Sequence, residues 1–503
     1  MSVNSSENTK SRPLGAIEKY SSIRHGLFQY FSVVFSAVIV PQNKTENPLS
    51  KENLFAAVND TIQKYPSSLA LTIKDSGTEN DFFQMVDSIN LSNHLIYAQK
   101  KVREAESTTP NELINVLKAS AIDLNKLDTD PEIIEGLETR VSTQFPDIES
   151  IPPWRLYLTP VLLGDEKKYA MHVLFAYHHS LGDGSTGRIF LESLARSLNK
   201  VGTVESSPIV QIPAKASLHP SLEQVSPLPQ SLWNIAKVIL QSKGWISSPN
   251  SHSWTGGSVP KTFGEDAAPY EEYLAKVSIL RISESDMTRI INVAKTRGVS
   301  VTATIVGLGS VALNAALQKY LTGNDESFST LSCCVPRNLR PNLTPETGVD
   351  ADTMGVYVCG IDVVVPTSKL GLDWDSVWVV ARQAKKKFTE ELSKGIKDTD
   401  TGMLKYVSSL VGFFKAKPGT KRSGSFEVSS IVATAPKEDA YTLIHPTFLQ
   451  SPSAMGAAIN LSIMSFKGRD LAIGFSWTTG AVQDNRIVNE MQAKMEQLIS
   501  QIE

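Results

Sequence analysis

The sequence predicts a two-domain protein of the α/β or α+β class. Its 503 residues exceed the length of roughly 250–300 at which a single hydrophobic core stops growing. Strand-like and helix-like patterns alternate in both halves, and a stretch dense in serine, proline and glycine separates them. The expected division is an N-terminal lobe at residues 1–203, a linker at 204–270 and a C-terminal lobe at 271–503.

The first half begins with an apolar, strand-like run over 27–40. A helical stripe over 54–62 follows and ends before Pro66, because proline disfavours helix in the residue that precedes it. Charged segments within 101–150 have helical spacing and are broken by prolines, which indicates surface helices. Further strands are expected at 69–74, 154–158 and 169–178.

The linker keeps a regular period only around 232–240, and the pattern recovers after it. The second half predicts a strand at 273–280, a helix at 284–296 closed by Gly298 and a long helix at 301–320. A final helix at 484–502 carries an apolar stripe typical of core packing. The remaining expected strands are 328–335, 357–365, 425–432, 457–464 and 470–477.

Composition excludes several classes of protein. The balance of 49 Lys+Arg against 52 Asp+Glu gives a net charge of −3, which argues against a protein that coats nucleic acid. Three cysteines are too few for a disulfide framework and lack zinc-ligand spacing, so we expect no metal and a reducing compartment. The polar start lacks the apolar core of a signal peptide, and the run at 27–40 is too short to span a membrane.

The segment 177–187, Tyr-His-His-Ser-Leu-Gly-Asp-Gly-Ser-Thr-Gly, carries the candidate chemistry. It follows a predicted strand, and its three glycines allow a sharp corner. A histidine there, with an ordinary pKa near ~6.5, is neutral at pH 7 and can accept a proton. His179 is therefore the candidate general base, and the alternative is a structural histidine at a strand end.

Three rival motifs are weaker. Gly307 and Gly309 resemble part of a dinucleotide fingerprint but lie inside a helical pattern. Ser185 resembles the serine of a nucleophile elbow, except that the position two residues before it is Asp183 instead of glycine. The run 385–387 of three lysines suits either an anion such as a cofactor phosphate or a solvated helix face.

The segment 178–184 resembles the H-H-x-x-x-D-G signature of the CoA-dependent acyltransferase superfamily, which includes chloramphenicol acetyltransferase, the plant BAHD enzymes and peptide-synthetase condensation domains. Other segments are similar to the fungal alcohol acetyltransferase family, and the similarity runs over residues 13–500. The late Asp-Phe-Gly-Trp-Gly motif of the plant enzymes is absent, with 474–477 in a comparable place. The segments that carry the fungal resemblance are 14–20 with Arg24 and His25, 152–156, 254–257, 425–430 and 448–451.

The resemblance implies two chloramphenicol-acetyltransferase-like lobes, each a mixed β-sheet with helices, and a solvent tunnel between them. It implies that acyl-CoA enters from one side and the acceptor from the other. His179 would take the hydroxyl proton while the oxygen attacks the thioester, with no acyl-enzyme. Asp183 would be structural and would pair with an arginine of the second lobe, with Arg340 expected first and Arg337 as the alternative.

The resemblance also implies supporting positions around the histidine. Gly184 would leave room for pantetheine, and His178 would support the loop. Ser429 and Ser430 stand where the family usually has Ser-Asn, and a hydroxyl there would contact acyl-CoA or the oxyanion. The alternative for these serines is hydrogen bonding to nearby backbone.

The function implied is an O-acyltransferase, with acetyl-CoA or another acyl-CoA as co-substrate and no bound cofactor. The acceptor would be a small alcohol or a secondary metabolite, so the setting would be fungal ester biosynthesis or secondary metabolism. The alternatives are an amine acceptor or a non-catalytic binding homologue. We expect a monomer in the cytoplasm, without a nucleic-acid partner or an integral membrane span, and relatives suggest peripheral attachment to endoplasmic reticulum or lipid droplets as the alternative.

Overall fold

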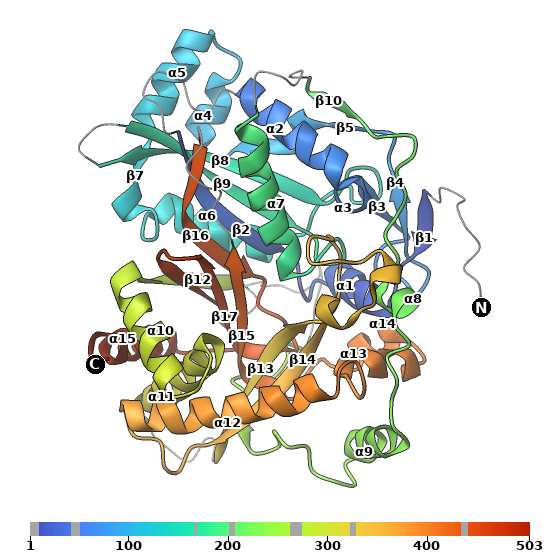
Figure 1. Ribbon diagram of the computed structural model, residues 1–503, viewed down its shortest axis with the longest axis vertical. Coiled ribbons are helices and arrows are strands. Elements are labelled where there is room, and N and C mark those ends of the chain that lie inside the picture. The colour runs from blue at the N-terminus through green and yellow to red at the C-terminus, as the bar shows by residue number, and fades with distance from the viewer. Residues whose placement is uncertain are drawn as a thin grey trace.

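A computed structural model describes residues 10–41, 51–164, 168–200, 207–261, 274–321, 328–433 and 441–502. The chain forms two lobes, and each is a mixed β-sheet with helices packed against it (Figure 1). The expected fold class is therefore confirmed. The candidate loop lies between the lobes, so the two sheets are described first.

The sheet of the first lobe has the order β16-β2-β9-β8-β6, with β7 also paired to β8. Alternate residues of β2 enter two different cores, because successive side chains of a strand point to opposite faces. Phe35 packs with α2 and α7, whereas Val34 packs with α6. These elements are β2 Val33–Pro41, β6 Leu95–Tyr97, β7 Ile122–Asp123, β8 Trp154–Leu163, β9 Lys168–Tyr177, α2 Lys51–Lys64, α6 Pro131–Ser142 and α7 Gly184–Leu198.

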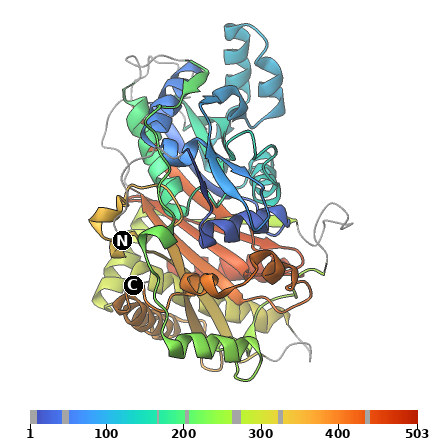
Figure 2. The same ribbon diagram turned by 90° about the vertical axis from the view of Figure 1, so that its right-hand side faces the viewer.

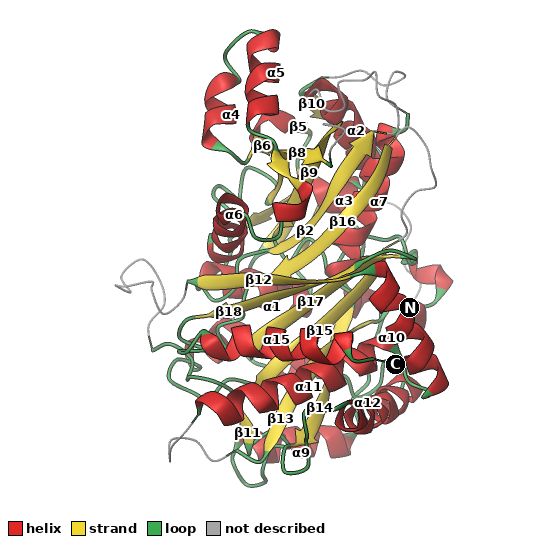
Figure 3. Cartoon of the chain, turned by 90° about the vertical axis from the view of Figure 1, so that its left-hand side faces the viewer, coloured by secondary structure: helices red, strands yellow, loops and turns green. Residues whose placement is uncertain are grey.

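The sheet of the second lobe has the order β11-β13-β15-β17-β18-β12, with β14 paired to β13. Four helices, α10, α11, α12 and α15, cover one face of it (Figure 3). The elements are β11 Ser253–Trp254, β12 Ala275–Ile282, β13 Thr330–Asn338, β14 Val358–Pro366, β15 Gly424–Ala433, β17 Ala457–Phe466, β18 Leu471–Thr478, α10 Glu284–Thr296, α11 Val301–Tyr320, α12 Trp374–Ser393 and α15 Arg486–Ser500.

Helix α11 is the central helix of the second lobe. Within the described ranges it is the one helix long and apolar enough to cross a membrane, yet 78% of its most apolar window is buried inside the protein. Its small residues allow close approach, and Gly307 lies where a Cβ would come within 2.5 Å of the Val377 carbonyl oxygen on α12. The glycines that resemble a dinucleotide fingerprint therefore serve helix packing here.

One strand does not follow the expected division of the chain. β16 (Tyr441–Gln450) belongs by sequence to the predicted C-terminal lobe of 271–503, but it pairs antiparallel with β2 in the first sheet (Figure 1). It covers the outer edge of β2, which would otherwise expose unpaired backbone groups. Leu443 and Phe448 of β16 enter the core of the first lobe.

The expected linker at 204–270 contains more regular structure than its composition predicts. Within it, β10 pairs with β5 (Ser88–Asn90) of the first lobe, while β11 joins the sheet of the second. Helix α9 lies at the end of the second lobe, away from the first lobe, and leaves Trp233 76% exposed (Figure 2). The linker elements are β10 Ile209–Gln211, α8 Leu222–Val225, α9 Leu232–Ser242 and β11.

The remaining elements flank the first sheet and the interface of the lobes. The expected strand at 27–40 begins later than predicted, at Val33, because α1 precedes it and ends at Gly26. These elements are β1 Ser11–Pro13, α1 Ala16–Gly26, α3 Pro66–Leu69, β3 Leu71–Lys74, β4 Phe82–Met85, β5 Ser88–Asn90, α4 Lys100–Ala105, α5 Pro110–Ala119, α13 Asp400–Met403 and α14 Leu410–Lys415.

Candidate active site

The loop between β9 and α7 carries the motif at 178–184 described above and is held at both ends. Asp183 caps α7, because its Oδ1 accepts a hydrogen bond of 2.9 Å from the backbone N–H of Ser185. The hydroxyl of Tyr177, the last residue of β9, donates to the backbone oxygen of Asp183 at 2.7 Å. The strand exit and the helix start are thus tied together around His179.

His179 is half-buried and lines a cavity between the lobes. Its Nδ1 is buried and has no hydrogen-bond partner in the described part of the chain, whereas Nε2 is not among the buried atoms and is the ring nitrogen available to the cavity. Burial, and then the nearby charge of Arg24, lower the pKa of His179 to about 4. The imidazole is therefore neutral at pH 7 and can accept a proton.

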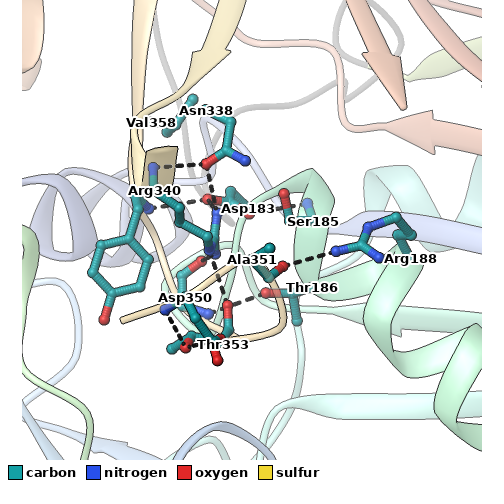
Figure 4. Close-up of polar contacts among 12 residues, drawn as sticks. Asp183, Ser185, Thr186, Arg188, Asn338, Arg340, Asp350, Ala351, Thr353 and Val358 are labelled. Carbon is teal, nitrogen blue, oxygen red and sulfur yellow. Dashed lines mark hydrogen bonds and ion pairs between the residues drawn. The ribbon is translucent and has the colours of Figure 1, made fainter. Parts of the chain in front are cut away.

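Asp183 also lines the cavity, but its carboxylate is bound to the second lobe. Its Oδ2 lies 2.8 Å from Nη1 of Arg340 and accepts a hydrogen bond of 3.0 Å from the backbone N–H of Tyr357 (Figure 4). Arg340 also donates to the backbone oxygens of Thr353 and Gly355, both at 2.9 Å. The carboxylate is thus occupied by donors that join the lobes.

Arg337, the alternative partner, lies elsewhere. It donates to the backbone oxygens of Glu391 and Gly395 at 3.0 and 2.9 Å, and to Oδ1 of Asn342 at 2.7 Å. These bonds connect β13 to the end of α12. The structure therefore pairs Asp183 with Arg340 and gives Arg337 a separate structural position.

The cavity has a volume of about 380 Å³ and takes its walls from both lobes. Gly184 lies on its wall at the first turn of α7, where a Cβ would meet Cδ1 of Ile431 at 3.0 Å. His178 does not line the cavity. Its Nδ1 accepts from the backbone N–H of Ser180 at 3.0 Å, and its ring packs 4.5 Å from that of His25, so it supports the loop from behind.

The two serines of β15 point in opposite directions. Ser429 lines the cavity, as does Glu427 two residues before it. Ser430 shares the strand face of Val428, which packs in the core of the second lobe, and it is not among the lining residues. Of the two expected contact residues, the structure brings only Ser429 to the cavity of His179.

Four further residues complete this wall, and their roles are not apparent from spacing alone. The ring of Tyr30 lies 5.6 Å from that of His179, and the Arg24 guanidinium lies 4.4 Å from the Tyr30 ring centroid. Gln450 accepts from the Tyr30 hydroxyl at 3.4 Å and donates to Glu427 at 2.6 Å. Arg24, Glu427 and Gln450 fall within the segments that resemble the fungal family, and that resemblance was the available signal for them.

Charge is unevenly distributed around the cavity. Asp362, Asp400 and Glu427 line the wall formed by the second lobe, and burial raises the pKa of each carboxyl. Arg24 is the one Lys or Arg among the described lining residues. The lysines at 385–387 lie on α12 and are not among them; Lys387, for example, pairs with Glu391 at 2.6 Å.

No group of three or more His, Cys, Asp or Glu side chains suited to a metal ion occurs in the part of the chain that the structure describes. The three cysteines are free, and Cys334 lines the cavity on the wall that the second lobe forms. Burial raises the pKa of Cys334 well above its usual value, which keeps the thiol protonated. The cavity thus presents one neutral imidazole, hydroxyls, carboxyls and one guanidinium.

Among solved structures, the fold is similar to that of the TRI3 trichothecene 15-O-acetyltransferase from Fusarium sporotrichioides, with a TM-score of 0.65, 12% identity and coverage of 97% of this chain and 94% of that one. It is also similar to the starter condensation domain of rhizomide synthetase RzmA, described in complex with C8-CoA and Leu-SNAC. There the TM-score is 0.57, the identity 11%, and the coverage 98% and 95%. These likenesses place the chain in a two-lobed fold shared by acetyltransferases and condensation domains.

Two sequence relatives have similar length. One is the probable alcohol acetyltransferase crmB of Aspergillus fumigatus, 22% identical over 449 residues, with 86% of each chain covered. The other is the probable alcohol acetyltransferase FCK4 of Fusarium pseudograminearum, 19% identical over 504 residues, with 95% and 92% covered. The family model described as alcohol acetyltransferase matches residues 13–499. The chain belongs to the alcohol acetyltransferase family.

Proposed function

We propose that the protein transfers an acyl group, most simply acetyl, from acyl-CoA to the hydroxyl of an alcohol, with His179 as general base. The observation that carries the proposal is a neutral imidazole whose Nε2 faces a cavity walled by both lobes. Membership of the alcohol acetyltransferase family supports acyl transfer to an alcohol. The neighbour in complex with C8-CoA supports an acyl-CoA donor.

In the proposed reaction the acceptor oxygen attacks the thioester carbonyl carbon while its proton passes to Nε2 of His179. A C–O bond forms and a tetrahedral oxyanion develops, and the hydroxyl of Ser429 is the proposed donor to it, since Ser429 lines the same cavity as His179. The C–S bond then breaks, and the CoA thiolate takes the proton from the imidazolium. Asp183 contributes by fixing the loop through Arg340 and does not exchange a proton.

The test incubates the purified protein with acetyl-CoA and a panel of alcohols and amines while free thiol is measured. We expect thiol release that depends on an alcohol. Its rate should fall by at least about a hundredfold in His179→Ala, because a general base usually raises the rate by at least that factor. His252→Ala is the matched control, because His252 is exposed and does not line the cavity. Thiol release that persists in His179→Ala contradicts the proposal, and so does the absence of thiol release with every acceptor. Thiol release with amines but not with alcohols would show that the protein is an N-acyltransferase.

A further inference from the structure

Arg24 is a buried cation without a counter-ion. The residue is 8% exposed, and no carboxylate of the described chain lies within ion-pair distance of it. Its Nε donates to the backbone oxygen of Tyr20 and its Nη2 to the Ser21 hydroxyl, both at the long distance of 3.3 Å. Nη1 has no acceptor among the described residues. Nη1 is not among the fully buried unpartnered atoms of the described chain, so it is open to the cavity, and a ligand acceptor that reached it would satisfy a donor that these residues leave unused.

Two aromatic rings fix the guanidinium in place. Its central carbon lies 4.4 Å from the ring centroids of both Tyr20 and Tyr30, so the side chain is held by cation–π contacts on α1 and on the residues that follow it. Tyr30 in turn lies 5.6 Å from the His179 ring, and all four residues line the same cavity. The free donor is therefore held rigidly on the wall beside the reacting histidine.

The chemistry of this wall selects the ligand. A guanidinium offers only donors, so the ligand must present an acceptor atom to it. Glu427, Asp362 and Asp400 line the same cavity, and a ligand with a full negative charge would meet their repulsion once they ionise. A neutral carbonyl oxygen accepts from Arg24 without that penalty.

We propose that Arg24 binds a carbonyl oxygen of the acceptor, so that the preferred acceptor is an alcohol that also carries a ketone, ester or lactone group. Gln450 and Glu427, joined at 2.6 Å, continue the same wall beyond the Tyr30 hydroxyl and offer acceptor atoms to a donor group of the same acceptor. This inference rests on the proposed function, since it assigns the acceptor side of the same cavity.

The test compares kcat/KM, with acetyl-CoA as donor, for a hydroxy ketone and for the alkanol of the same carbon skeleton. We expect wild type to prefer the hydroxy ketone and Arg24→Ala to reduce that preference by about tenfold or more, the usual effect of losing a hydrogen bond to a charged group. Arg155→Ala is the matched control. Arg155 is also buried, at 6% exposure, but it donates to backbone oxygens of its own segment and does not line the cavity.

Calorimetric titration with the acetylated hydroxy ketone, without CoA, gives a second readout that needs no turnover. Binding at least about tenfold weaker in folded Arg24→Ala than in wild type supports the inference, and unchanged binding overturns it. Equal losses of kcat/KM on both acceptors also overturn it, because Arg24 would then act on the shared thioester. If no acceptor gives thiol release, the proposed function is refuted. The titration still tests the role of Arg24 in that case, because it measures binding of the carbonyl ligand without turnover.

Discussion

The carboxylate of Asp183 in the first lobe lies 2.8 Å from the guanidinium of Arg340 in the second, and their side chains are only 7% and 1% exposed. The pair is therefore a buried contact that couples the loop of His179 to the opposite lobe. Its surroundings supply further donors and acceptors to both groups, which is the condition under which a buried ion pair is tolerated.

Removing one partner of this pair should destabilise the protein strongly. Asp183→Ala leaves the Arg340 charge buried, and we expect a loss of about 3–5 kcal/mol in the free energy of unfolding, measured by urea denaturation. The double variant Asp183→Ala with Arg340→Met should lose less than the sum of the single losses. Asp484→Ala is the control, because its partner Arg486 is 70% exposed, and it should change stability by less than about 1 kcal/mol. Single variants that unfold at the wild-type midpoint would show that the pair does not hold the lobes.

The pH dependence of kcat/KM should report the lowered pKa of His179. A group with a pKa of about 4 stays neutral well below the ordinary histidine value, so the rate should hold between pH 7 and about 5 and fall only below that. Arg24→Gln removes a positive charge that lowers this pKa, so its acid limb should move to higher pH. An acid limb centred near pH ~6.5 in wild type would contradict the environment assigned to the imidazole.

The two serines of β15 should differ in kinetic effect. Ser429→Ala removes the hydroxyl on the cavity wall, and we expect kcat to fall by about ten- to a hundredfold with the protein still folded. Ser430→Ala changes the opposite strand face and should leave kcat within about twofold of wild type. Equal effects of the two substitutions would refute the oxyanion role of Ser429.

Two glycines within helices offer a matched packing test. A Cβ at Gly187 of α7 would come within 2.0 Å of the Phe35 ring, so Gly187→Ala should lower the free energy of unfolding by about 1–3 kcal/mol. Gly136 of α6 has no atom within 4 Å of its ideal Cβ, and Gly136→Ala should raise stability by about 0.5–1 kcal/mol. Thermal or urea unfolding measures both, and a stabilising Gly187→Ala would contradict the packing of α7 on β2.

Much of the fold follows from local pattern. Runs of β-branched residues predict β9, β15 and β17, and apolar stripes predict α11 and α15. In each of these segments the apolar pattern of the segment itself is enough to predict a buried strand or helix. β16 was not predicted. Its pattern is interrupted at Pro446, and His445 has a positive φ of 56° beside a break in register. Its partner β2 is about four hundred residues away in the chain, and no local signal carries that pairing.

The candidate site, like the fold, could be predicted from the sequence only in part. The position of His179 at a strand exit follows from the alternation before it and the glycines after it. The environment of Arg24 follows only in part. Tyr20 lies four residues before it on α1, where side chains at that spacing meet, whereas Tyr30 and β15 are brought to it by the tertiary fold. Ser429 and Ser430 are equivalent in composition, and only the direction of β15 distinguishes them.

The placement of β16 bears on how the protein is made. During synthesis the first lobe emerges long before residues 441–450, so its sheet must wait with the edge of β2 uncovered until most of the second lobe has left the ribosome. Such distant pairing slows folding, since the entropy of closing a very long loop must be overcome first. The two lobes therefore mature together, and a fragment ending at residue 203 is expected to aggregate through its open strand instead of folding alone.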